Sequence, residues 1–156
     1  MKHVSMQNAG WAGGTSIPHI APGLHSLVYA PVELASDFSV MTLNELRMTF
    51  ILASICGRKV NPFRLVPEIL IMFGGAKGAQ LLATQLLGKV PAGAGTLLKA
   101  GVAFAFTYAI GEAVFVNMNY GITSNKTHLM NRVEELKGYG EEVAKSIVGT
   151  IRKSKE

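Results

Sequence analysis

The sequence predicts an all-α protein: a small-residue-lined antiparallel helical hairpin packed with flanking amphipathic helices. Three observations predict this class. Apolar residues recur at three- and four-residue steps in several segments. Glycine and alanine recur at four-residue steps through two long apolar segments. Charged residues make up 16% of the 156 residues, against roughly a quarter in an average domain. Such a chain is suited to helices that pack closely.

Three parts are expected along the chain: an N-terminal segment over 1–36, a helical hairpin domain over 37–120 and an amphipathic C-terminal helix over 121–156. The N-terminal segment is rich in Gly, Ala, Pro and Ser, so we expect it to be flexible or irregular. No continuous apolar core follows its first basic residues. We therefore expect no signal peptide and an intracellular protein.

The first helix of the hairpin domain is predicted over Val40–Ile55. Its expected buried face follows the three- and four-residue apolar steps and comprises Leu43, Leu46, Phe50, Ile51 and Ile55. Glu45 falls on the opposite, polar side, whereas Arg47 projects within the apolar arc and would have to snorkel or find a partner. Gly57 is expected just after the helix, where a left-handed residue often ends it.

Two long apolar helices are predicted next, from about Asn61 or Pro67 to Gly88 and from Thr96 to Asn117. Breakers mark the turn between them: Pro91, Gly93 and Gly95. Exposed N–H groups in such a turn could bind an anion, but a tight connection between helices is the favoured interpretation.

Small residues spaced by four line both helices of the hairpin and predict close helix packing. They are Gly74 and Gly78 in the first helix, and Gly101, Ala105, Ala109 and Ala113 in the second. If the helices run antiparallel about the turn, Gly78 faces Ala105 and Gly74 faces Ala109. Glycine costs a helix interior about 1 kcal/mol relative to alanine, so the retained glycines favour contact between backbones.

The last helix is predicted over Lys126–Ile151. Its apolar face comprises Leu129, Val133, Leu136, Val143, Ile147 and Ile151. Acids come first and bases last, which complements the helix dipole, and Gly138 and Gly140 are expected to weaken or bend the middle. Three roles stay open: packing on the hairpin, pairing with another chain, or lying on a membrane surface.

No catalytic, cofactor-binding or metal site is predicted, and the protein is not expected to be an enzyme. Cys56 is the only cysteine, and no histidine lies close enough in sequence to suggest a base for it. His19 and His25 lack the ligand number and spacing of a metal site. The net charge of +5 favours anionic partners such as lipid headgroups. Nucleic acid is not an expected partner, because the bases do not interleave with aromatic residues.

Membrane contact and a soluble bundle both remain open from the composition. Ile69–Leu87 and Ala100–Met118 have about the length of a spanning helix. Each carries one charge, Lys77 and Glu112, and a central charge costs about 2.5–3.5 kcal/mol on insertion. The expected location is therefore the inner face of, or within, the cytoplasmic membrane, and otherwise the cytoplasm.

Four stretches carry a resemblance to a known family: 44–57, 74–78, 90–96 and 107–113. They resemble the bacterial "domain of unknown function" family numbered 697, over roughly residues 31–116. Members of that family are often fused to, or encoded near, Era-like GTPase domains, and some are inner-membrane proteins. The matching residues, whose roles look structural, are Gly74, Gly78, Pro91, Gly95 and Gly111.

The resemblance implies a membrane-associated helical module that works with a GTPase. The chain contains no GxxxxGK[ST] motif, so that GTPase would be a separate polypeptide. We therefore expect a non-enzymatic, membrane-associated interaction module. The alternative is a soluble homo-oligomeric helical scaffold without membrane contact, in which the small-residue rows or the last helix pair between chains.

Overall fold

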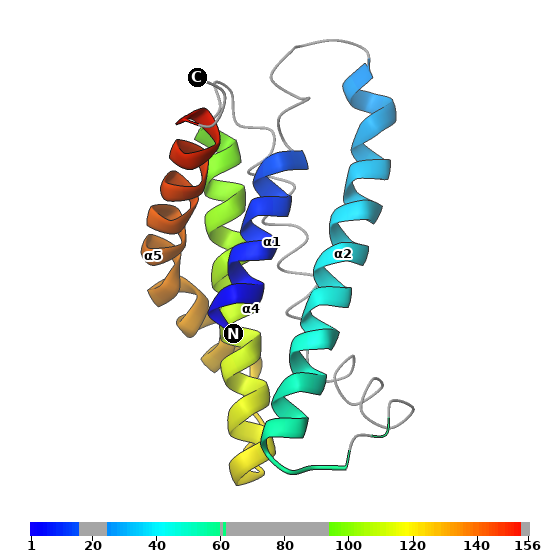
Figure 1. Ribbon diagram of the computed structural model, residues 1–156, viewed down its shortest axis with the longest axis vertical. Helices are drawn as coiled ribbons and strands as arrows, with labels where there is room; N and C mark the ends of the chain where they lie inside the picture. The colour runs from blue at the N-terminus through cyan, green and yellow to red at the C-terminus, as the bar shows by residue number, and fades with distance from the viewer. Residues whose placement is uncertain (16–24, 60, 62–93, 154–156) are drawn as a thin grey trace.

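A computed structural model describes residues 1–15, 25–59, 61 and 94–153 (Figure 1). The described chain contains four helices and no strand: α1 (Lys2–Thr15), α2 (His25–Ile55), α4 (Ala94–Tyr120) and α5 (Lys126–Lys153). The predicted all-α class is confirmed. The two C-terminal helices begin and end within three residues of their predicted bounds.

Helix α4 lies at the centre of the described bundle, with α1, α2 and α5 around it (Figure 1). A short connection reverses the chain, so α5 runs antiparallel to α4. Helix α1 is also antiparallel to α4, because Asn8 contacts Thr107 and Met1 lies beside Gly111. Helix α2 runs parallel to α4, since Glu45 contacts Thr107 and Arg58 contacts Met118. Helices α2 and α5 flank α4 on opposite sides (Figure 1).

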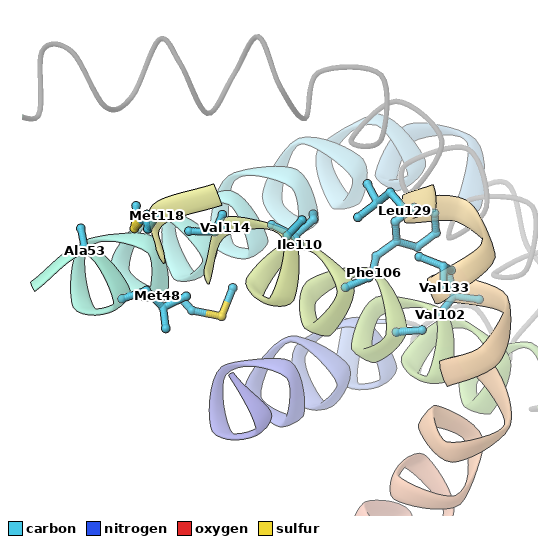
Figure 2. Close-up of a cluster of buried hydrophobic side chains, with 13 residues drawn as sticks. Met48, Ala53, Val102, Phe106, Ile110, Val114, Met118, Leu129 and Val133 are labelled. Carbon is cyan, nitrogen blue, oxygen red and sulfur yellow. The ribbon is translucent and has the colours of Figure 1, made fainter. Parts of the chain in front are cut away.

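The largest apolar cluster joins α4 to both flanking helices (Figure 2). Phe106 and Ile110 of α4 lie at its centre and are almost fully buried. Met48 contributes from α2, and Leu129 and Val133 contribute from α5. Burial of each large side chain of this kind stabilises the folded state by about 1.5–3 kcal/mol. The cluster explains why α4 is apolar around most of its circumference.

The end of α2 is a Schellman cap, as the sequence predicts. Gly57 has a φ of 67°, in the left-handed region that glycine adopts without strain. The N–H of Gly57 donates to the carbonyl of Ser54, and the N–H of Arg58 donates to the carbonyl of Ala53. These two bonds satisfy carbonyls that the end of a helix leaves without an intrahelical donor.

The expectation of a flexible or irregular segment over 1–36 is wrong for most of its described part. Residues 2–15 form α1, and α2 already begins at His25. Helix α1 buries small and polar residues against α4, among them Asn8, Ala9 and Ala12. A face of small residues has no periodicity of large apolar residues, so the usual helix signal is missing. The division of the chain into three parts stays a prediction.

The predicted buried face of α2 is wrong for Leu43, Ile51 and Ile55, whereas Leu46 and Phe50 are half-buried. Leu43 is 65% exposed and Ile55 is 70% exposed, whereas Glu45, expected on the polar side, is only 4% exposed. The residues that α2 buries are Met41, Glu45, Met48, Thr49, Leu52 and Ala53. The helix carries an apolar row on each side, and the polar contacts of Glu45 determine which side faces α4.

The predicted hairpin is described only in its second helix. Residues 62–93, which include Lys77, Pro91 and Gly93, lie outside the described residues, and the facing pairs of Gly74 and Gly78 therefore stay predictions. Gly95, expected in the turn, instead lies in the first turn of α4. Helix boundaries inferred from breakers are uncertain by a few residues, because glycine is tolerated in a first turn.

Candidate functional site

The predicted small-residue row of α4 is buried along its length. Ala105, Ala109 and Ala113 all belong to the central apolar cluster. Gly101 lies apart from them, against α5, where a Cβ atom would come within 3.0 Å of the backbone nitrogen of Glu141. The row is therefore a packing surface. Its described partners include α5, whereas the predicted partner was the other helix of the hairpin.

Gly140 is the counterpart of Gly101 on α5. A Cβ atom at Gly140 would overlap the carbonyl oxygen of Gly101, so the two backbones touch. The glycines at 138 and 140 do not interrupt α5, which is continuous from Lys126 to Lys153, and the expectation that they weaken or bend its middle stays a prediction. Gly140 permits the close crossing of α4 and α5.

Gly111 provides a second close approach, where α1 and α2 meet α4. A Cβ atom there would lie 2.7 Å from Cγ of Met1 and 3.0 Å from Sδ of Met48. Methionine side chains are flexible and fill irregular gaps. The absence of a side chain at Gly111 leaves space for both of them.

Three helices meet at a buried chain of polar side chains. Asn44 Nδ2 donates to Asn8 Oδ1 at 2.7 Å. Asn8 Nδ2 donates to Thr107 Oγ1 at 2.9 Å. Thr107 Oγ1 donates in turn to Glu45 Oε1 at 3.2 Å. We call Asn8, Asn44, Glu45 and Thr107 the polar junction; it joins α1, α2 and α4.

The polar junction fixes how the three helices are aligned. Asn8 and Thr107 are fully buried and Glu45 is 4% exposed, and burying a polar group without a partner costs about 1–3 kcal/mol. A shift of one turn along any helix would separate these groups. The junction was not predicted, because Asn8 was assigned to an irregular segment and Glu45 to the solvent side. No local signal identifies the two residues, because each stands near other polar residues, such as Gln7 and Arg47.

Glu112, the acid that disfavoured insertion of α4 into a membrane, is paired with Arg132 of α5. Arg132 Nε lies 2.6 Å from Glu112 Oε2, and its Nη2 lies 2.9 Å from Oε1. A third bond, from Nη1, reaches Glu135 at 2.8 Å. Hydrogen bonding to Glu112 and then to Glu135 holds the pKa of the Arg132 guanidinium above its ordinary value. The side chains are 38% and 30% exposed, so water screens this pair in part.

One helix is long and apolar enough to cross a membrane, the stretch Leu97–Tyr120 of α4. This statement covers only the described residues. Of its most apolar window, 78% is buried inside the bundle. A core helix of a soluble protein and a spanning helix both have this composition, and the burial shows that other helices cover most of its surface.

The outward side of α2 carries large apolar residues in contact with solvent. We define the α2 outer face as Leu43, Arg47, Ile51 and Ile55, which recur every four residues and are all exposed. A row of this length extends about 18 Å along a helix. Arg47 was expected to snorkel along an apolar arc, and it lies exposed between Leu43 and Ile51. Contiguous exposed apolar residues are typical of a contact surface.

The remaining candidate residues do not assemble a reactive site in the described chain. Cys56 is half-buried and its Sγ accepts a hydrogen bond from Asn119 Nδ2 at 3.2 Å. Among the described residues, no three His, Cys, Asp or Glu side chains are grouped as metal ligands would be. His25 is the first residue of α2, and His19 lies outside the described ranges.

Comparison with known proteins provides no relative from which a function could be inferred. No protein-family model, curated protein or solved structure matches this chain. The resemblance to the family numbered 697 therefore stays a prediction.

Proposed function

We propose that this chain is a non-enzymatic, membrane-associated helical interaction module that contacts the membrane through the α2 outer face. The observation that carries the proposal is the exposure of Leu43, Ile51 and Ile55 in one row. Exposed large apolar side chains gain about 1.5–3 kcal/mol each when they are fully removed from water. A helix that presents such a row lies in the interface between headgroups and acyl chains.

The opposite side of the bundle supports the same orientation. Helix α5 lies across α4 from α2 (Figure 1) and exposes acids, including Glu134, Glu135 and Glu142. Its apolar residues Leu129 and Val133 are buried against α4. Helix α5 therefore uses its apolar face within the protein, and beyond its first turn it presents a charged face to water.

A separate GTPase is the proposed protein partner. Support for it comes from the resemblance of residues 44–57 and 107–113 to a family associated with Era-like GTPases. The test is affinity purification of the tagged chain from membranes of its host, with GDP or a non-hydrolysable GTP analogue present. Enrichment of a GTP-binding polypeptide in one nucleotide state supports the partnership, and its absence in both states contradicts it.

A soluble homo-oligomeric scaffold is the second candidate, favoured by the 78% burial of the most apolar window of α4. In that case a second copy would cover the α2 outer face. Membrane fractionation with a salt wash followed by alkaline carbonate separates the two candidates. Recovery of the chain with the membrane fraction before the washes, followed by release in salt or carbonate, supports a module that contacts the membrane surface. A soluble oligomer that Ile51→Gln dissociates supports the scaffold.

A further inference from the structure

We propose that the α2 outer face selects an anionic lipid surface, with the basic residues at the C-terminal end of α2 contacting the phosphate groups. This inference rests on the proposed membrane association and names the chemistry of the lipid. The evidence for it is that the exposed charges around the apolar row are positive.

The first argument is that the stretch from Ser39 to Lys59, which contains the apolar row, exposes only positive charge. Between Ser39 and Lys59 the sequence holds four charged residues. Arg47, Arg58 and Lys59 are exposed, whereas Glu45 is buried in the polar junction. Because the only acid of this stretch is turned inward, the outward surface has a single sign. Basic residues beside an apolar helix face are typical of binding to anionic membranes.

The second argument is that further apolar and basic residues gather at the same end of the bundle. Arg58 Nε donates to the carbonyl of Met118 at 3.0 Å, which holds the end of α2 against the end of α4. Tyr120 is 71% exposed and Ile122 is 59% exposed just beyond this contact. Aromatic residues with one polar end favour the headgroup region of a membrane.

Lys126 adds to the positive charge at this end. It is exposed and is the first residue of α5. A base there opposes the helix dipole, which favours acids in the first turn. Helix stability therefore does not favour Lys126 at this position, whereas an anion outside the protein would pair with it. The sequence contains no Asp or Glu between Ala113 and Val133, so no acid within six residues of Lys126 along the chain offsets its charge.

An anionic membrane fits this surface better than nucleic acid or a protein loop of the same charge. The basic side chains of the protein could bind the phosphate groups of nucleic acid, but Ile51, Ile55 and Ile122 would then remain in water. A phospholipid layer supplies both partners, a phosphate plane and an apolar layer beneath it. Each lysine near an anionic membrane strengthens binding by about fivefold.

The test measures binding of the 156-residue chain to vesicles of phosphatidylcholine, with and without phosphatidylserine. The variant Lys59→Gln/Lys126→Gln removes two charges from the proposed surface. The control Lys137→Gln/Lys145→Gln removes two charges from α5. Arg58 is left unchanged because it holds α2 against α4.

The expected result is tighter binding to vesicles with phosphatidylserine, weakened about 25-fold by Lys59→Gln/Lys126→Gln, at about fivefold for each lysine. The control should bind within a few-fold of the wild type, and salt should weaken the wild type. Equal binding to both vesicles would overturn the inference and leave membrane association standing. Binding to neither vesicle would overturn the proposed function as well. Tighter binding to polyuridylate than to either vesicle would overturn the lipid assignment.

Discussion

Gly101 of α4 and Gly140 of α5 touch through their backbones where the two helices cross. The carbonyl oxygen of Gly101 occupies the space that a Cβ atom at Gly140 would need. The three atoms nearest to an added Cβ at Gly140 all belong to the backbone of Gly101, so a methyl group at Gly140 would have to push the helices apart. The absence of a side chain at both positions is what permits this close crossing.

Gly140→Ala is therefore expected to destabilise the protein by about 1–3 kcal/mol, the usual range for overpacking. Gly138 provides the control, because it lies in the same helix with nothing within 4 Å of an added Cβ. Gly138→Ala should stabilise the protein by about 0.5–1 kcal/mol through helix propensity. Urea unfolding followed by circular dichroism measures both. Equal effects of the two substitutions would refute the close crossing.

The bounds of α4 and α5 could be predicted from the sequence, but α1 could not. Helix α5 has a strong apolar period, and its described residues Leu129, Val133, Leu136 and Val143 pack on the bundle as expected. In α1 the buried residues are small or polar. Only their contacts with α4 identify them as the buried face of a helix. Such contacts join residues about 100 positions apart and leave no local signal.

The orientation of α2 could not be predicted for a related reason. Leu43, Ile51 and Ile55 are exposed, whereas Leu52 and Glu45 are buried. An amphipathic pattern assigns the apolar arc to the core when the protein has only one apolar environment. The pattern is misleading in α2 because apolar residues stand on two sides of the helix, and the pattern does not say which side faces α4.

Thr107→Val is expected to cost about 2–4 kcal/mol of stability. The substitution removes the acceptor of Asn8 Nδ2 and the donor to Glu45 Oε1, which leaves two buried polar groups without those bonds. Thr49→Val is the matched control, because Thr49 is equally buried but bonds only to the carbonyl of Glu45 within α2. The control should lose about 1 kcal/mol or less. If thermal unfolding shows the same loss for both, the polar junction does not align the helices.

Glu112→Gln should destabilise the protein by about 0.5–1.5 kcal/mol. The substitution removes one carboxylate of a two-bond ion pair with Arg132, and partial exposure limits the effect. Glu134→Gln is the comparison, since Glu134 is exposed and lies 3.7 Å from Lys137 within one helix. Its effect should stay below about 0.5 kcal/mol. The loss from Glu112→Gln should shrink in high salt, and a loss no larger than that of Glu134→Gln would contradict the role of the pair.

A single substitution on the α2 outer face should weaken membrane association without unfolding the bundle. Ile51→Gln replaces an exposed side chain, so stability should change by less than about 0.5 kcal/mol. Loss of its burial in lipid should weaken vesicle binding about tenfold. Met6→Gln is the control, because Met6 is 39% exposed on α1 and Ile51 is 48% exposed on α2. An equal effect of both substitutions would show that the contact is not specific to α2.

Flotation of the wild-type chain and of Leu43→Gln/Ile51→Gln with vesicles containing phosphatidylserine tests the central claim most directly. The account predicts that the wild type floats with the vesicles, that the double variant stays at the bottom of the gradient, and that both unfold at similar urea concentrations. A wild type that stays at the bottom, or a double variant that floats as well as the wild type, would contradict membrane contact through the α2 outer face.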